Sequence, residues 1–70
     1  HDNLKNYYQL VNIYLKDSDY DNALDTYYKI EEKFGFNVDN VLRRKDIFFK
    51  LKEYQKAEKE MDLLIKRYPE

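Results

Sequence analysis

A chain of 70 residues has room for one small hydrophobic core, and the absence of cysteine rules out a disulfide or a thiolate metal site as a stabilising staple. The net charge of −1 hides a mild asymmetry between residues 1–37, at −3, and residues 38–70, at +2, but neither half is charged enough to predict a nucleic-acid or membrane partner. The aromatic content of 17% argues against disorder, and one glycine and one proline favour long helices with short turns.

The first helix is expected from about Leu4 to Lys16, with Asp2 or Asn3 as its cap. Apolar residues recur at the i, i+3, i+4, i+7 spacing of one helical face, namely at Leu4, Tyr7, Tyr8, Val11, Tyr14 and Leu15. The segment 17–19 that follows is polar and so short that it can form only a tight turn.

A second helix is expected over residues 20–34. Ser18, with Asp21 three residues later, resembles a capping box that opens this helix. Gly35 is expected to end it in the left-handed αL conformation. The apolar side consists of Tyr20, Ala23, Leu24, Tyr27, Ile30 and Phe34.

Two more helices are expected near residues 38–51 and 53–67. Asn37 can cap the third helix, the fourth has no strong cap near Lys52 and Glu53, and Pro69 must lie beyond its end. Their apolar residues are Val38, Val41, Leu42, Ile47, Phe48, Phe49 and Leu51, then Tyr54, Ala57, Met61, Leu64, Ile65 and Tyr68. No segment alternates apolar and polar residues for long, and no hairpin-turn dipeptide occurs. The fold class is therefore all-α, with four antiparallel helices.

A shift of 34 residues brings the two halves of the chain into register without a gap. The matched pairs are Leu4/Val38, Asn6/Asn40, Ile13/Ile47, Tyr14/Phe48, Lys16/Lys50, Tyr20/Tyr54, Ala23/Ala57, Ile30/Leu64, Lys33/Arg67 and Phe34/Tyr68. A helix pair that recurs at this period is typical of the tetratricopeptide repeat family. This resemblance implies a single domain over residues 1–70, with one repeat at 4–37 and another at 38–70.

The family pattern W-x2-L-G-x2-Y, A-x3-F and P can be placed on both halves. The first half supplies Tyr7, Leu10, Val11, Tyr14, Ala23 and Tyr27, and the second supplies Val41, Arg44, Lys45, Phe48, Ala57, Met61 and Pro69. Ala23 and Ala57 are expected at close helix crossings. The polar Arg44 and Lys45 suggest a terminal repeat or a looser contact. The fourth helix has Glu58 and Asp62 where the second has Leu24 and Tyr28, which suggests a solvated end.

By this resemblance, the first helix of each pair lines a concave groove that binds an extended peptide. The groove residues would be Lys5, Tyr8, Gln9, Asn12 and Lys16, then Asp39, Leu42, Arg43, Asp46 and Lys50. Their mixed charge suits a ligand with polar ends and an apolar anchor. The alternative is that these residues only form solvated helix faces. Of the carboxylate clamp found in some members of the family, only Asn12 matches, so that function is not supported.

No pattern in the chain indicates an enzyme, a metal site or a cofactor. A hydrolytic triad needs a histidine, and the only one is His1. The acidic segment 17–21 superficially resembles a calcium loop, but Asn22 and Tyr28 stand where such a loop needs glycine and glutamate. The run Arg43-Arg44-Lys45 could contact RNA phosphates, yet ion pairs on the helix surface explain it better.

The expected function is therefore a protein-interaction scaffold, a fragment of a larger repeat protein with a protein or peptide partner. One alternative is self-association between copies through an apolar strip of Tyr7, Leu10 and Val11 on the first helix. Another is a spacer or regulatory segment of a multidomain protein. No apolar run is long enough for a membrane span, and a cytoplasmic location is favoured.

Overall fold

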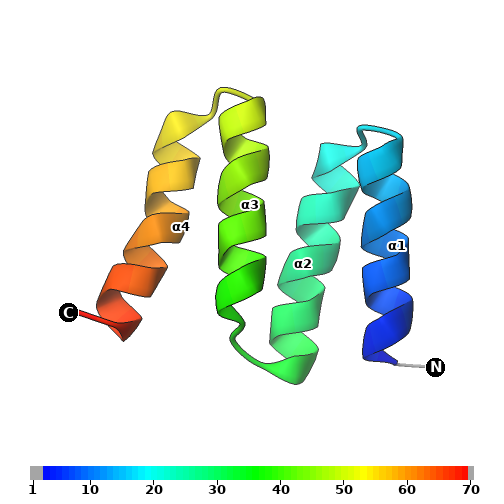
Figure 1. The fold of residues 1–70 in the computed structure, drawn as a ribbon, viewed down its shortest axis with the longest axis horizontal. Coiled ribbons are helices and arrows are strands. Elements are labelled where there is room, and N and C mark those ends of the chain that lie inside the picture. Colours follow the sequence, from blue (N-terminus) through cyan, green and yellow to red (C-terminus); the bar gives the residue numbers. More distant parts are fainter. Residues whose placement is uncertain (1–2, 70) are drawn as a thin grey trace. The chain divides into compact units, whose positions relative to one another are not determined.

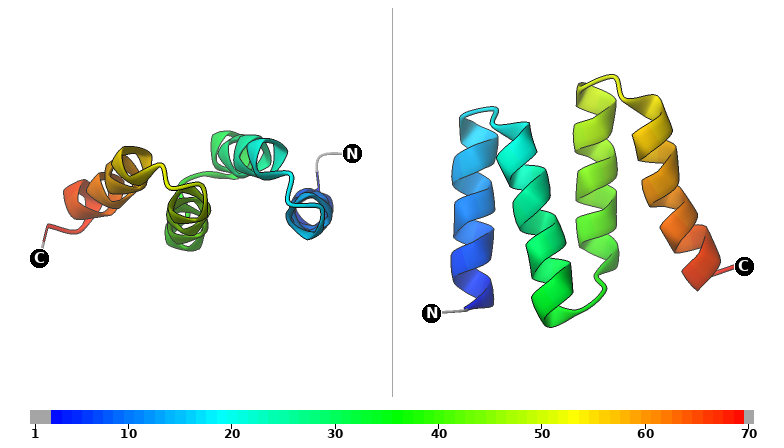
Figure 2. Two further views of the ribbon diagram at one scale, coloured as in Figure 1. Left: turned by 90° about the horizontal axis from the view of Figure 1, so that it is seen from above. Right: turned by 180° about the vertical axis from the view of Figure 1, so that it is seen from behind.

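The computed structural model describes residues 3–69, which form four α-helices (Figure 1). These are α1 (Leu4–Lys16), α2 (Tyr20–Phe34), α3 (Val38–Lys50) and α4 (Tyr54–Arg67). The chain divides into two compact units between Phe36 and Asn37. In each unit two antiparallel helices are joined by a tight turn (Figure 2), and we call these the N-terminal hairpin (α1, α2) and the C-terminal hairpin (α3, α4). The all-α expectation is confirmed, and the helix bounds differ from those expected by one residue at the α3–α4 turn.

Side chains cap two of the helices as the sequence predicts. The Oδ1 atom of Asn3 accepts a hydrogen bond from the backbone N–H of Lys5 at 2.8 Å, at the start of α1. The Oδ1 atom of Asn37 accepts one from the N–H of Asn40 at 3.1 Å, at the start of α3. Each bond satisfies a donor that the first helical turn leaves without an intrahelical partner. The other expected cap, Asp2, lies outside the described residues.

The expected capping box at Ser18 is wrong, because the cap of α2 is Asp19. The Oδ1 atom of Asp19 accepts from the backbone N–H of Asn22 at 3.4 Å, and its Oδ2 accepts from the Asn22 side chain at 2.7 Å. Ser18 instead has a φ of 56° and forms part of the turn. Glu53 occupies the corresponding place before α4 and makes no capping bond with its side chain, as expected.

The α1–α2 and α3–α4 turns have the same backbone construction. The N–H of Asp19 donates to the carbonyl of Tyr14 at 2.8 Å, and the N–H of Glu53 donates to that of Phe48, also at 2.8 Å. Ser18 and Lys52, which are 34 positions apart, have φ values of 56° and 60°. Both hairpins thus reverse direction by one left-handed residue followed by the N-cap of the next helix.

Gly35 ends α2, but its conformation is not the expected αL form. Its φ of 100° and ψ of 173° lie in a region that residues with a side chain hardly enter. Its N–H donates to the carbonyl of Glu31 at 2.8 Å, which closes the last helical turn. No heavy atom lies within 4 Å of the place where a Cβ would stand, so the backbone angle alone favours glycine here.

The core of the N-terminal hairpin is apolar apart from the buried Thr26. Its fully or nearly fully buried members are Val11, Ala23, Leu24, Tyr27 and Ile30. The complete burial of Ala23 is as predicted. Leu4 and Phe34, which were expected on the buried face, are exposed at the open end of the hairpin, where the ring of Phe34 meets Tyr7 edge-on at 5.9 Å.

The core of the C-terminal hairpin combines apolar and charged residues. Val41, Ile47, Phe48 and Ala57 are buried, and so are Asn40, Arg44 and Glu60. The predicted burial of Ala57 is confirmed. Tyr54 was expected in the core but is 57% exposed. It is the first residue of α4 and lies at the turn end of the hairpin.

Candidate protein-interaction surfaces

The α1 residues that were predicted to bind a peptide share one face of that helix. Lys5, Tyr8 and Asn12 are separated by three and four positions, a spacing that aligns side chains along a helix. Lys5 and Asn12 are exposed, and Tyr8 is half-buried. The aromatic ring is thus partly fixed by packing while part of it stays accessible between two polar side chains.

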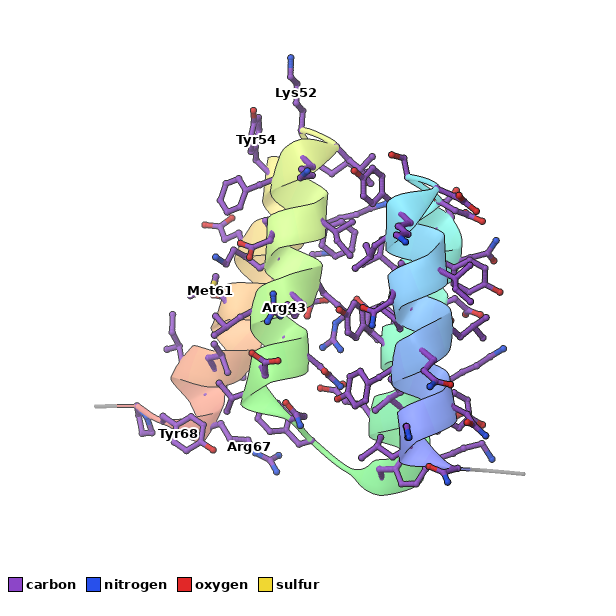
Figure 3. All side chains as sticks on the ribbon, turned by 45° about the vertical axis from the view of Figure 1, so that its right-hand side comes forward. Arg43, Lys52, Tyr54, Met61, Arg67 and Tyr68 are labelled. Atoms are coloured by element: carbon purple, nitrogen blue, oxygen red, sulfur yellow. The ribbon has the colours of Figure 1, made fainter. Side chains whose placement is uncertain are left out.

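The predicted α3 residues form a similar row on their own helix. Leu42 is half-buried, and Arg43, Asp46 and Lys50 are exposed. The Nε atom of Arg43, on the outside of α3 (Figure 3), lies 3.5 Å from Oδ2 of Asp39, and Oδ1 of Asp46 accepts from the neighbouring Lys45 at 2.8 Å. The pair of Arg43 with Asp39 is solvent-exposed, so a ligand could displace it at little cost, whereas Lys45 in the second pair is half-buried.

Arg44 makes the contact that the sequence prediction missed. Its side chain is completely buried, and its Nε donates to Oε1 of Glu60 at 2.9 Å, while its Nη2 lies 2.9 Å from the same oxygen. Arg44 is therefore tightly packed within the C-terminal hairpin and does not mark a looser contact between α3 and α4. An arginine at a packed position needs a buried acid opposite, and Glu60 on the facing helix could have been found by that rule.

The run Arg43-Arg44-Lys45 consequently does not form one basic patch. Arg43 makes a surface ion pair, Arg44 is buried, and Lys45 is half-buried, with its Nζ bonded to Asp46 and 5.8 Å from the ring centre of Phe49. The expectation of helix-surface ion pairs is confirmed for Arg43 and Lys45 and wrong for Arg44. Adjacent helical residues point in different directions, which explains the split.

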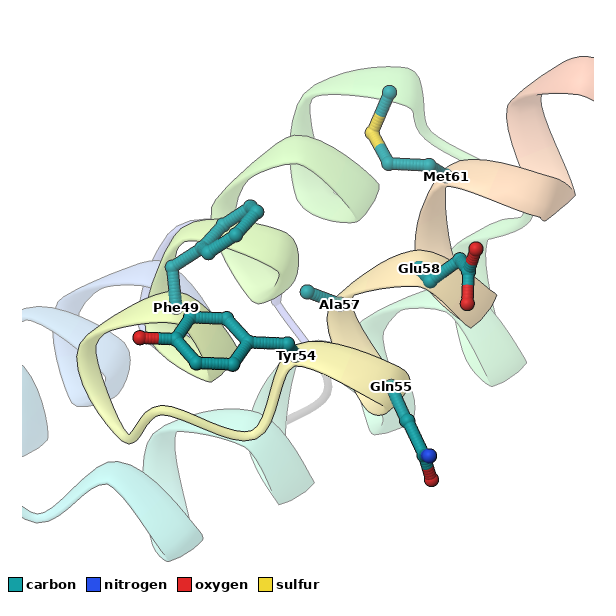
Figure 4. A pocket seen from close by; sticks show the side chains of 6 residues that line it. All are labelled: Phe49, Tyr54, Gln55, Ala57, Glu58 and Met61. Carbon is teal, nitrogen blue, oxygen red and sulfur yellow. The ribbon is translucent and has the colours of Figure 1, made fainter.

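The C-terminal hairpin has an open hollow of about 430 Å³ near its turn (Figure 4). It is lined by Phe49, Tyr54, Gln55, Ala57, Glu58 and Met61. The Phe49 and Tyr54 rings lie 5.7 Å apart on one side, and Met61 lies across from them, beyond the small side chain of Ala57. Phe49 is 50% exposed, so each of the two rings offers a large apolar area.

The predicted apolar strip on α1 is smaller than expected. Val11 belongs to the core, Tyr7 is half-buried, and Leu10 is the exposed member. On α4, Glu58 and Asp62 are exposed as expected for a solvated face. Leu63 and Ile65 on the same helix are exposed as well, so apolar exposure is not confined to the first helix.

Residues 3–69 show no signature of a metal site or of a membrane span. Within that range, no group of three or more His, Cys, Asp or Glu side chains could hold a metal ion. None of the four helices described is long and apolar enough to cross a membrane.

Comparison of the chain with models of known protein families gave no match, and comparisons with curated proteins and with solved structures gave none either.

Proposed function

We propose that this protein is an interaction module made of two helical repeats similar to tetratricopeptide repeats, which binds a peptide or a helix of a partner protein through the faces of α1 and α3 that carry Tyr8 and Leu42. The observation that carries the proposal is the equivalence of Tyr8 and Leu42. They lie 34 positions apart, and both are half-buried among exposed polar side chains. Such residues can serve as apolar anchors without reorganising the core.

The construction of the two hairpins also supports the repeat interpretation. The two turns have matching hydrogen bonds and matching left-handed residues, and each hairpin has a buried alanine at the same place. Two hairpins built alike at this period are what a repeat array consists of.

The charges near the anchors suggest the chemistry of the ligand. Lys5 lies near Tyr8, and Arg43 and Asp46 lie near Leu42, so both signs of charge are available. A peptide with an apolar side chain between oppositely charged residues would match these faces. Two short helix faces bury a small interface, below about 1,200 Å² in total, which gives micromolar affinity.

Selection of random dodecapeptides displayed on phage against the 70-residue chain tests the proposal. We expect enriched peptides to bind with micromolar affinity in fluorescence anisotropy, and Tyr8→Ala and Arg43→Ala each to weaken that binding about tenfold. Lys29→Ala is the matched control for Arg43→Ala, because Lys29 makes a comparable exposed ion pair with Asp25 on α2, at 3.3 Å. Failure to enrich any peptide would overturn the proposal, and so would equal weakening by the control.

A further inference from the structure

The turn ends of the two hairpins carry opposite charge. Residues 16–22, the acidic turn, contain one lysine and three aspartates, a net charge of −2. Residues 50–56, the basic turn, contain three lysines and one glutamate, a net charge of +2. These two segments occupy equivalent places in hairpins of the same construction, so the difference in charge is not a consequence of different backbone geometry.

Part of this charge is not compensated within the chain. Asp19 caps α2, and Glu53 pairs with Lys56 at 2.7 Å. By contrast, the exposed side chains of Asp17 and Asp21 in the acidic turn, and of Lys50 and Lys52 in the basic turn, make no ion pair with any residue in the described range 3–69. Lys52 extends outward from the α3–α4 turn, close to Tyr54 (Figure 3).

Exposed apolar side chains lie beside both sets of charges. Phe49 and Tyr54, from the hollow, adjoin the basic turn. Ile13, 56% exposed, lies one helical turn before Asp17 and lines a shallow depression together with Leu15. Each end therefore offers an apolar area beside a turn whose net charge has one sign, although Glu58 also lines the hollow and Lys16 also lines the depression.

We propose that the basic turn and the hollow beside it form a docking surface for a second copy of this chain, which contributes its acidic turn and Ile13. Turns of opposite charge attract and turns of like charge repel. The contact therefore pairs the basic turn of one copy with the acidic turn of another. Lys16 and Lys50 belong both to these turns and to the ends of the α1 and α3 rows proposed to bind peptides, whereas the anchors Tyr8 and Leu42 lie outside both turns.

A charge swap tests the proposal on the full chain. One variant carries Lys50→Glu and Lys52→Glu, and the other carries Asp17→Lys and Asp21→Lys. By sedimentation velocity at about 20 mM NaCl, we expect the parent to associate with rising concentration, each variant alone to remain monomeric, and an equimolar mixture to associate again, because the mixture restores basic against acidic ends. For the parent, about 500 mM NaCl should weaken association about tenfold or more.

Control variants separate this contact from general charge effects and from the strip on α1. Asp25→Lys and Lys59→Glu, exposed but outside the two turns, should leave association unchanged. Leu10→Glu should also leave it unchanged, whereas it would abolish an association through the first helix. Circular dichroism confirms that each variant is folded. A parent that stays monomeric up to about 1 mM, or a mixture of folded variants that does not associate, would overturn the proposal.

Discussion

Where the N-terminal hairpin has Leu10 and Thr26, the C-terminal hairpin has Arg44 and Glu60, 34 positions later. The hydroxyl of Thr26 is satisfied within its own helix, because it donates to the carbonyl of Asn22 at 2.8 Å. Arg44 instead bonds across to Glu60 on the facing helix.

The comparison shows that one hairpin geometry can be held in two ways. The hydroxyl of Thr26 bonds within its own helix, and the buried contact between α1 and α2 is made by apolar side chains such as those of Val11, Ala23 and Ile30. The buried ion pair links α3 to α4 through directed bonds, and each partner makes the burial of the other tolerable. The C-terminal hairpin should therefore be more sensitive to the loss of a single polar side chain.

The largest effect is expected from Arg44→Ala, which leaves Glu60 buried without its cation. We expect a loss of about 3–5 kcal/mol in the free energy of unfolding, measured by urea titration followed by circular dichroism. Because a core of this size supplies only about 3–5 kcal/mol, the C-terminal hairpin should be largely unfolded.

The double change Arg44→Leu with Glu60→Thr, which installs the residues of the N-terminal hairpin, should recover most of that loss. Arg43→Ala is the control on the neighbouring residue, and its exposed ion pair should contribute about 0–1 kcal/mol. If Arg44→Ala and Arg43→Ala had equal effects, the buried pair would not hold this hairpin together.

Overpacking of the two helix crossings should have a smaller effect. Ala23 and Ala57 are buried at equivalent places, so Ala23→Leu and Ala57→Leu should each cost about 1–3 kcal/mol. Ala57→Leu should cost less, because Ala57 borders the open hollow, into which part of the new side chain can extend. Thermal melts of both variants check this order, and a melt of Ala23→Leu identical to that of the parent would refute the placement of the crossing.

The smallest effect concerns the caps of α2 and α4. Asp19 caps α2 with its side chain, and Glu53, at the equivalent place, makes no capping bond. Glu53→Asp should therefore stabilise the chain, by about 0.5–1 kcal/mol, and Asp19→Ala should destabilise it by about 1 kcal/mol. Chemical denaturation can resolve both changes, and a destabilising Glu53→Asp would show that the ion pair of Glu53 with Lys56 outweighs a cap.

The sequence predicted the helices well because periodicity and caps act locally. Asn37 and Gly35 mark helix ends by their own chemistry, and both ends were placed correctly. The conformation of Gly35 and the choice of Asp19 over Ser18 were missed, because the path of the turn decides which residue faces the open N–H groups. Serine and aspartate are both good N-caps, so the local sequence does not distinguish Ser18 from Asp19.

Features that depend on the facing helix were harder to predict. Arg44 looks like a surface residue until Glu60 is placed opposite it. Tyr54 fits the apolar pattern of its helix, yet at the first position of α4 its ring extends past the core. For the candidate site, the pattern correctly indicated that Tyr8 and Leu42 stay partly accessible, and it gave no sign of the hollow, which two helices form together.

The proposed function is tested most directly by a residue-by-residue map of peptide binding. We would titrate ¹⁵N-labelled protein with the selected peptide and follow amide and side-chain shifts by NMR. We expect the largest shifts on α1 and α3, around Tyr8, Asn12, Leu42 and Arg43, while exposed Tyr28 on α2 and Ile65 on α4 barely move. Shifts confined to α2 and α4 would contradict the proposed function.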